Sequence, residues 1–546
     1  MASDTSSSRL DLIVIGAGIN GAGIARDAAL RGLRVLLLDK GDIASGTTSW
    51  STRLIHGGLR YLEHGEIGLV RESLRERERL LHIAPHLVRP LPVLLPIYRG
   101  DRRGQLLIRA GMAAYDVLSR GKSLPSHRML DRAAALRRAP GLAEHGLLGA
   151  ALYHDAQVEY AERLALENAL DAKDHGAVVG AYHQVDEILS RDGRVTGVAG
   201  RDVLTGEPFQ FEAPVVVNVA GPWVDEVLAG TQGGERPRLI GGSKGSHIVV
   251  DPFPNAPRDA LYAEAREDGR PFFIIPWNDL YLIGTTDTRY DGDLDRVMAE
   301  EWEIDLLLAE TNRIIPDANL TRENVRYSYA GVRPLPYVPG ESEGSVTRRH
   351  IVRDHAVSSG PRGMISIVGG KLTTYRELAE QTVDLILRKL GRAAVRSRTG
   401  EMPLPGGKSD LPWAEFAASF VRESGLPRQS AEHLLRVYGT RAPEVLATAE
   451  TPELREVFDP LTGAIAAEAP WAFRQEGART LGDVIARRTM TGLGPNAGIG
   501  ADAAAAQVAR DTLGWDAARA DAEVDAYRRW VSRYQPRALA AAATGA

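Results

Sequence analysis

Three glycines near the start of the chain have the spacing that binds a dinucleotide. Gly16, Gly18 and Gly21 follow a short apolar run, and Asp39 ends the next apolar run, residues 35–38. In a strand–helix–strand unit, the first glycine allows a tight turn, the second lets the backbone approach a pyrophosphate, and the third lets the helix pack closely. The helix N-terminus then faces the anion, and the carboxylate binds ribose hydroxyls. The spacing therefore predicts a dinucleotide-binding βαβ unit.

A hydroxyl-rich segment, residues 46–61, favours a flavin over a nicotinamide. It contains several Ser and Thr residues, followed by Arg, His and paired glycines. A flavin dinucleotide has a ribityl chain and a ring edge with many hydrogen-bonding atoms, and such a segment can satisfy them. A polar surface loop is the alternative interpretation. We expect these members of the segment to contact FAD: Thr47, Thr48, Ser51, Arg53, Leu54, His56, Gly57 and Gly58.

Two later segments have the same character. Residues 215–223 are typical of a buried strand that ends in small residues, and residues 365–374 are typical of a strand followed by a glycine turn. A helix N-terminus after the second strand would stabilise negative charge on a reduced flavin ring. Either segment alone is also common in ordinary α/β connections. Together with Asn20 of the glycine motif, the predicted FAD contacts then include Ala220, Gly221, Gly370, Lys371, Leu372 and Thr373.

The composition excludes several classes of protein. The 546 residues, 44% hydrophobic and 25% charged, are typical of a globular protein with several domains. A formal net charge of -5 gives no basic surface for nucleic acid. The chain has no cysteine, so it has no disulfide, thiolate nucleophile or Cys-ligated metal, and we expect a cytoplasmic protein with no metal whose redox chemistry comes from a cofactor. No apolar stretch reaches the about 18 residues that span a bilayer.

Apolar runs and helical patterns alternate up to about residue 400, as in a mixed α/β fold. The clearest predicted strands are residues 215–219, 247–250, 272–275, 281–283 and 365–368. The clearest predicted helices are residues 22–31, 67–81 and 160–175. After the Pro- and Gly-rich residues 403–407 the strand signals vanish. Amphipathic helices are predicted there at residues 414–423, 430–438, 481–489, 502–513 and 520–534.

Six motifs, in order along the chain, resemble the FAD-dependent glycerol-3-phosphate dehydrogenases of the aerobic type. They are residues 15–21, 53–63, 244–247, 283–287, 331–335 and 369–375. The resemblance implies an α/β fold with a Rossmann-like FAD-binding domain, an interleaved sheet-based substrate domain and a helical C-terminal domain. We expect the FAD-binding domain at residues 9–90, 150–243 and 345–395, the substrate domain at 91–149 and 244–344, and the helical domain at 400–536. Residues 1–8 and 538–546 are expected to be disordered.

The same resemblance implies the activity and its partners. The enzyme would oxidise sn-glycerol 3-phosphate to dihydroxyacetone phosphate, with a hydride moving from C2 to flavin N5 and electrons passing to a membrane quinone. It would bind peripherally to the anionic inner face of the cell membrane, and a homodimer is one option for its assembly. Three alternatives stay open: an oxidase that uses O2, a related amine or amino-acid oxidase, and a non-catalytic flavoprotein.

Oxidation of a secondary alcohol that carries a phosphate requires cations near the flavin and a base for the hydroxyl proton. The positions that resemble the family's substrate contacts are Arg60, Tyr61, Arg333, Arg348 and Lys371. An Arg fork binds two phosphate oxygens at once, and the apolar neighbours of Arg333 favour a buried charge. For the base we prefer His247, with His56 as the competitor, because imidazole titrates near neutral pH. The predicted catalytic residues are His247, Arg333 and Lys371.

Residues 99–112 combine arginines with an apolar run around Leu106, Leu107 and Ile108. A helix of this kind can lie in the interface of an anionic membrane. A solvated helix face is the alternative. We therefore expect this segment to be a candidate membrane-docking surface.

Overall fold

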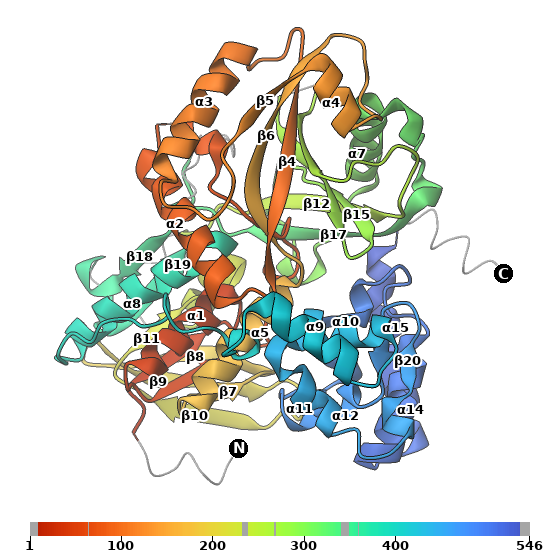
Figure 1. Ribbon diagram of the computed structural model, residues 1–546. Coiled ribbons are helices and arrows are strands. Elements are labelled where there is room, and N and C mark those ends of the chain that lie inside the picture. The colour runs from red at the N-terminus through yellow and green to blue at the C-terminus, as the bar shows by residue number, and fades with distance from the viewer. Residues whose placement is uncertain are drawn as a thin grey trace.

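The computed structural model describes residues 9–63, 65–231, 238–266, 269–339, 349–358 and 360–535. The expectation of disorder at residues 1–8 and 538–546 lies outside the described residues. Figure 1 shows three parts: a strand-rich part at the top, a parallel-sheet part at the lower left, and a helical part at the lower right.

The parallel-sheet part is built on a six-stranded sheet that is covered on both faces. In spatial order its strands are β18 (Ile351–Asp354), β19 (Met364–Val368), β11 (Val216–Asn218), β1 (Leu12–Ile15), β2 (Val35–Leu38) and β7 (Val178–Gly180). Neighbouring strands are parallel except β18 and β19. One face packs on α1 (Ile19–Leu30), α5 (Ala161–Asp174) and α8 (Tyr375–Lys389). The other packs on a small sheet of β8 (His183–Arg191), β9 (Arg194–Asp202) and β10 (Pro208–Glu212).

Alternate residues of β1 explain this double cover. Leu12 and Val14 belong to the core shared with the helices, whereas Ile13 and Ile15 belong to the core shared with the small sheet. A strand buried on both faces is a continuous apolar run, because successive side chains point to opposite faces. Because β1 and β2 pair in parallel, their carboxyl ends lie together at one edge of the sheet, where ligands bind in open α/β folds.

The strand-rich part is built on a large sheet, and we call it the large-sheet part. Its ten strands are β3 (Leu54–Ile55), β4 (Val88–Tyr98), β5 (Arg128–Asp131), β6 (Leu147–Val158), β12 (Ser243–Val250), β13 (Ala260–Glu264), β14 (Pro271–Trp277), β15 (Leu280–Gly284), β16 (Thr288–Arg289) and β17 (Val325–Arg333). Apolar residues of α4 (Arg132–Arg138) and α7 (Glu301–Ile314) share one core with the sheet. Those of α2 (Ile67–Ile83) and α3 (Gln105–Leu118) share another.

The strand β6 crosses the expected domain boundary at residue 150. It pairs antiparallel with β4 from Leu147 to Val158, so residues 150–158 belong to the large sheet rather than to the parallel one. Local periodicity cannot assign a strand to one of two sheets, because the pairing partner decides it.

The third part is helical, as expected, with one exception. Its helices are α9 (Trp413–Glu423), α10 (Arg428–Tyr438), α11 (Ala442–Ala447), α12 (Glu468–Arg474), α13 (Leu481–Asp483), α14 (Ala501–Leu513) and α15 (Ala517–Val531). A π-helix, Val484–Arg488, continues α13. The exception is a hairpin of β20 (Val457–Asp459) and β21 (Ala464–Ile465), whose strands are too short to show a period.

Buried ion pairs join the helical part to the parallel-sheet part, which contains the predicted dinucleotide-binding unit. Asp42 accepts two hydrogen bonds from Arg488, at 2.7 and 2.8 Å, and one from Arg487 at 2.6 Å. Arg163 on α5 donates from NH1 and NH2 to the two carboxylate oxygens of Glu476, at 2.6 and 3.0 Å. All these side chains are buried. The loop after β2 is therefore fixed by residues more than four hundred positions away.

Candidate active site

The glycine motif forms the turn that the sequence predicts. Gly16 follows β1 with φ of 109°, and a Cβ atom there would lie 2.7 Å from the carbonyl oxygen of Val219. A Cβ atom at Gly21 would lie 1.8 Å from the carbonyl oxygen of Gly16. Only glycine fits either position: Gly16 because of its positive φ and the closeness of Val219, and Gly21 because the helix packs directly on the turn. The helix α1 begins at Ile19, with Gly18 as its N-cap and no side-chain cap.

The carboxylate of Asp39 lies at the end of β2, beside this turn. It accepts hydrogen bonds from the amides of Ala17 at 2.6 Å and Gly41 at 2.8 Å. Burial raises the pKa of Asp39 to about 6, although both amides favour its ionised form. The carboxylate is thus held rigidly at the mouth of the turn, where a ribose hydroxyl could donate to it.

A cavity of about 680 Å³ extends from this turn. It is bounded by the glycine turn, the hydroxyl-rich segment, the end of β11 and the glycine turn after β19. Its remaining sides are formed by Ala330, Gly331, Val332 and Pro334, and by Leu294, Asp295 and Val297. These predicted FAD contacts line it: Gly16, Gly18, Asn20, Asp39, Thr47, Thr48, Ser51, Ala220, Gly221, Gly370, Lys371 and Leu372. The four separate segments chosen from the sequence therefore meet around one space.

The cavity has the chemistry that a flavin dinucleotide requires. Its volume is in the range of cofactor sites. Three buried polar atoms of its wall residues have no hydrogen-bond partner in the described part of the chain: Oδ1 of Asn20, Nε1 of Trp223 and Nε of Arg533. Buried polar atoms are normally paired, so one acceptor and two donors are available here to a ligand. These residues fit FAD.

The other predicted FAD contacts lie behind the cavity wall. Arg53 is buried, pairs with Glu162 at 2.7 and 2.8 Å, and lies 4.6 Å from the ring of Trp277. The hydroxyl of Thr373 accepts from the amide of His56 at 3.2 Å. The remaining members that do not line the cavity are Gly21, Leu54, Gly57 and Gly58. These residues support the wall and do not form its surface.

Several residues of the wall were not predicted from the sequence. Trp50 was inside the hydroxyl-rich segment and could have been chosen for its type. Residues 183–186, the start of β8, lie beside Asp39 in the wall, and no element or site residue was predicted there. Trp530 and Arg533 come from the helical part, for which no site residue was predicted. Only the tertiary fold brings these residues to the cavity.

One group of predicted substrate residues lies around Lys371. Its Nζ donates to Oγ of Ser73 at 2.8 Å and lies 4.7 Å from the ring centroid of Tyr61. Tyr61 and Arg60 belong to a short 3₁₀ helix, Leu59–Leu62. Lys371 itself lines the cavity. The prediction for Arg348 lies outside the described residues.

Arg333 is the last residue of β17, and its neighbours Val332 and Pro334 line the cavity. Its NH1 lies 3.1 Å from Oδ1 of Asp287, and its NH2 donates to Oγ1 of Thr285 at 3.1 Å. The side chain is half-buried and is paired with a carboxylate, where the sequence suggested a buried charge. Its guanidinium is therefore held in one orientation beside the wall.

His247, on β12, is buried behind the hydroxyl-rich segment. Its Nε2 lies 2.9 Å from Oγ1 of Thr52, and its ring packs on Tyr329 with centroids 4.9 Å apart. Burial, with the nearby cations Arg333 and Arg53, holds the pKa of His247 well below its usual range. Its buried Nδ1 has no partner among the described residues. The imidazole is neutral at pH 7, as a base requires, but it does not line the cavity.

The competitor His56 lies near the Lys371 group. Its ring is 6.5 Å from that of Tyr61. Burial lowers the pKa of His56; Asp155 opposes this effect, and Lys371 adds to it. Both histidines are thus neutral near pH 7, and protonation state does not distinguish them.

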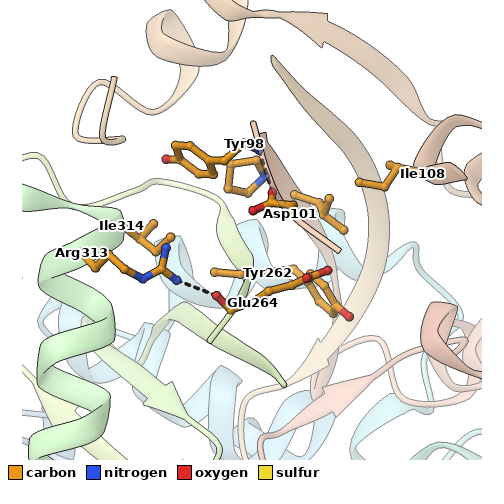
Figure 2. A pocket seen from close by; sticks show the side chains of 10 residues that line it. Tyr98, Asp101, Ile108, Tyr262, Glu264, Arg313 and Ile314 are labelled. Atoms are coloured by element: carbon orange, nitrogen blue, oxygen red, sulfur yellow. Dashed lines mark hydrogen bonds between the residues drawn. The ribbon is translucent and has the colours of Figure 1, made fainter. Parts of the chain in front are cut away.

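A second cavity, in the large-sheet part, is too small for a substrate (Figure 2). Its volume is about 20 Å³, which is room for roughly one water. Arg313 closes one side by donating to the carbonyl oxygen of Glu264 at 2.6 Å, and Asp101 accepts from the amide of Tyr98 at 2.7 Å. Burial raises the pKa of Tyr98 to about 12. The dinucleotide cavity is therefore the site to consider for chemistry.

Two known families together match most of the chain. Residues 11–376 match the FAD dependent oxidoreductases, and residues 397–520 match the C-terminal domain of alpha-glycerophosphate oxidase. A glycerol-3-phosphate dehydrogenase of Synechocystis sp. is 49% identical over 534 residues, which are 96% of each chain. The glycerol-3-phosphate dehydrogenase 2 of Mycobacterium bovis is 38% identical over 95% of this chain and 87% of that one.

A solved structure gives the same result. The glycerol-3-phosphate dehydrogenase of Bacillus halodurans, complexed with FAD, is similar with a TM-score of 0.79 and 30% identity, over 97% of this chain and 96% of that chain. These similarities confirm the predicted fold class, the resemblance drawn from the six motifs, and FAD as the cofactor. The chain belongs to the family of FAD-dependent glycerol-3-phosphate dehydrogenases.

Proposed function

We propose that the protein oxidises sn-glycerol 3-phosphate to dihydroxyacetone phosphate and passes the electrons to a membrane quinone. Bound FAD would supply the hydride acceptor at N5 for the oxidation of C2 of the substrate. The observation that carries the proposal is the position of two cations from different parts of the fold. Lys371 lies in the cavity wall, and Arg333 lies between two residues of the same wall. Two such cations could bind the phosphate of a substrate next to the flavin.

Each predicted substrate residue has a role in this proposal. Arg333 and Lys371 hold the phosphate and orient C2, with Arg60, Tyr61 and Arg348 as further contacts. His247 takes the hydroxyl proton, since its depressed pKa keeps the imidazole neutral. His56 is the competitor for this step.

Anaerobic reduction tests the activity. Glycerol 3-phosphate added to the purified holoenzyme should bleach the flavin absorbance, whereas glycerol and amino acids should leave it unchanged. Bleaching by an amino acid instead would indicate an amino-acid oxidase. No bleaching by any of them would indicate a flavoprotein without this catalysis.

The acceptor needs its own measurement, because the matched C-terminal domain family is named after an oxidase. Reduction of a soluble quinone by glycerol 3-phosphate, without oxygen uptake, is the expected result. Oxygen uptake equal to substrate turnover would identify an oxidase and would contradict the quinone proposal.

We also propose that α3 docks the protein on the inner face of the cell membrane. Ile108, Met112 and Tyr115 face the core, while the opposite face exposes Leu106 by 83% and Val117 by 58%. Exposed apolar side chains beside arginines suit an anionic bilayer surface. Among the described residues, no helix is both long and apolar enough to cross a membrane.

Vesicle binding tests the docking proposal. The holoenzyme should co-sediment with anionic vesicles, and Leu106→Glu or Arg109→Glu should release it. Arg428→Glu, an exposed change on the helical part, is the matched control. Equal binding by all variants would remove α3 as the docking surface.

A further inference from the structure

The last helix of the chain reaches the cofactor cavity. Trp530, near the end of α15, and Arg533, in the following 3₁₀ helix Ser532–Tyr534, both line it. The ring of Trp530 lies 6.2 Å from that of Trp50, another residue of the wall. The C-terminal family match ends at residue 520, so it does not include this contact.

Asp295 is the point where all three parts of the fold meet. It lies in the 3₁₀ helix Leu294–Arg296 of the large-sheet part. Its Oδ1 lies 2.6 Å from Nζ of Lys40, a residue just after β2. Its carbonyl oxygen accepts a hydrogen bond from NH1 of Arg533 at 3.1 Å. Lys40 also lies 4.7 Å from the ring centroid of Trp223. Lys40, Trp223, Asp295 and Arg533 all line the cavity.

The two cations of this group suit an anionic cofactor. Arg533 has a buried Nε with no hydrogen-bond partner among the described residues, so one donor beside the cavity is unused. Lys40 is about one-third exposed and Asp295 is more exposed, so their pair lies where the cavity meets solvent. A ligand that entered or left on this side would have to separate Lys40 from Asp295.

We propose that Lys40, Asp295, Arg533 and Trp530 form a latch over the FAD cavity, and that the C-terminal helix is thereby part of the cofactor site. The latch holds the nucleotide by keeping the three parts of the fold together at one edge of the cavity. It goes beyond the proposed function, because it concerns retention of FAD and does not depend on the electron acceptor.

Two substitutions separate the contacts of Asp295. Asp295→Asn removes the ion pair with Lys40 but keeps the carbonyl oxygen that Arg533 contacts. Arg533→Met removes the second contact and the unused donor. We expect Asp295→Asn to speed FAD dissociation about twofold to fivefold, the effect of one exposed pair. Arg533→Met should speed it about tenfold, and Arg533→Lys should do so less.

The measurement is the rate at which the fluorescence of free FAD appears after the holoenzyme is diluted into buffer without FAD, at a protein concentration low enough that rebinding is negligible. Salt should speed release from the natural protein, because ions screen an exposed pair. Asp295→Asn should lose much of this salt dependence. In a double-mutant cycle, Lys40→Met with Asp295→Asn should release FAD no faster than the faster single variant.

The matched control is Asp305→Asn, which removes a similar exposed pair with Arg322 in the same part of the chain, away from the cavity. It should release FAD at the natural rate. Circular dichroism and the unfolding temperature of the apoprotein show whether each variant is folded. Natural release rates in folded Arg533→Met and Asp295→Asn, or equal acceleration by Asp305→Asn, would overturn the latch.

Discussion

Oγ1 of Thr52 lies 2.9 Å from Nε2 of the buried His247. Thr52 follows Ser51, which lines the cavity, so one hydrogen bond connects the imidazole to the cavity wall. Tyr329, the neighbour of His247 on β17, packs on the ring and donates its hydroxyl to the carbonyl oxygen of Ser51 at 3.0 Å. The proposed base is therefore held between the wall and the large sheet, and its orientation can be tested apart from its basicity.

Thr52→Val keeps the side-chain shape but removes the hydroxyl that orients His247. We expect kcat to fall by about tenfold while FAD stays bound, whereas His247→Asn should lower kcat by about 10²- to 10⁴-fold, as loss of a base does. Steady-state kinetics with glycerol 3-phosphate, together with the flavin content, measures both. If His56→Asn causes the larger loss and His247→Asn has little effect, His56 is the base.

The depressed pKa of His247 predicts how it affects stability. Below its ordinary value of 6.5, the unfolded chain binds a proton that the buried imidazole does not. The free energy of unfolding therefore falls as the pH falls through this range. His247→Gln should remove its share of that slope, which urea unfolding at about pH 5 to 8 measures. An unchanged slope would show that the imidazole is not buried in its neutral form.

Asp39 predicts a pH dependence of FAD binding. Its carboxylate accepts from two amides, and burial raises its pKa to about 6. Protonation converts one acceptor oxygen into a donor that faces an N–H group. The Kd for FAD should therefore rise as the pH falls below 6, and Asp39→Asn should bind FAD weakly with less dependence on pH. Equilibrium titration of apoprotein with FAD measures this.

The same shift has an opposite consequence for the apoprotein. Between 3.8 and about 6, folded Asp39 binds a proton that the unfolded chain releases. The contribution of Asp39 to stability is thus largest at low pH and is lost as the pH rises through about 6. FAD affinity and apoprotein stability should therefore change in opposite directions with pH at this residue.

Arg333→Ala tests the phosphate contact. We expect kcat/KM for glycerol 3-phosphate to fall by about 10²-fold or more, because a charge-assisted contact is lost, while the flavin content stays normal. Arg333→Lys should recover only part of the activity, since a lysine cannot make the forked contact. Unchanged kinetics in Arg333→Ala would remove it from the site.

Asp42→Ala tests the buried ion pairs between the helical part and the parallel-sheet part. Burial raises the pKa of Asp42, but Arg488 and Arg487 outweigh burial and hold that pKa below its ordinary value. The substitution leaves two buried guanidinium groups without this partner and should lower the free energy of unfolding by about 3–5 kcal/mol. Glu432→Gln, which removes an exposed pair with Arg428, should change it by less than about 1 kcal/mol.

Local spacing was sufficient for the dinucleotide-binding turn. Gly16, Gly18 and Asp39 lie within one βαβ unit, so their sequence separation fixes their positions. Arg53 shows the limit of this reasoning. It lies among wall residues in sequence, but its partner Glu162 is 109 positions away and holds it behind the wall. No local pattern distinguishes an arginine that binds a ligand from one that pairs internally.

The far side of the cavity depends on contacts that no periodicity encodes. Thr47 donates to the carbonyl oxygen of Val332 at 2.7 Å, across 285 positions, and so brings β17 to the hydroxyl-rich segment. Trp530 and Arg533 lie on a helix whose amphipathic pattern was predicted, but the pattern does not say what the helix packs against. The sequence thus indicated the elements, and long-range pairing determined the wall.

The strand β6 runs along β4 for its whole length, and α5 begins at Ala161, directly after it. Consequently, no flexible linker separates the large-sheet part from the parallel-sheet part at this crossing. A hinge rotation there would break ladder hydrogen bonds or bend a paired strand, both of which cost free energy. This crossing should therefore keep its geometry during catalysis, and access to the cavity should depend on side chains and short loops.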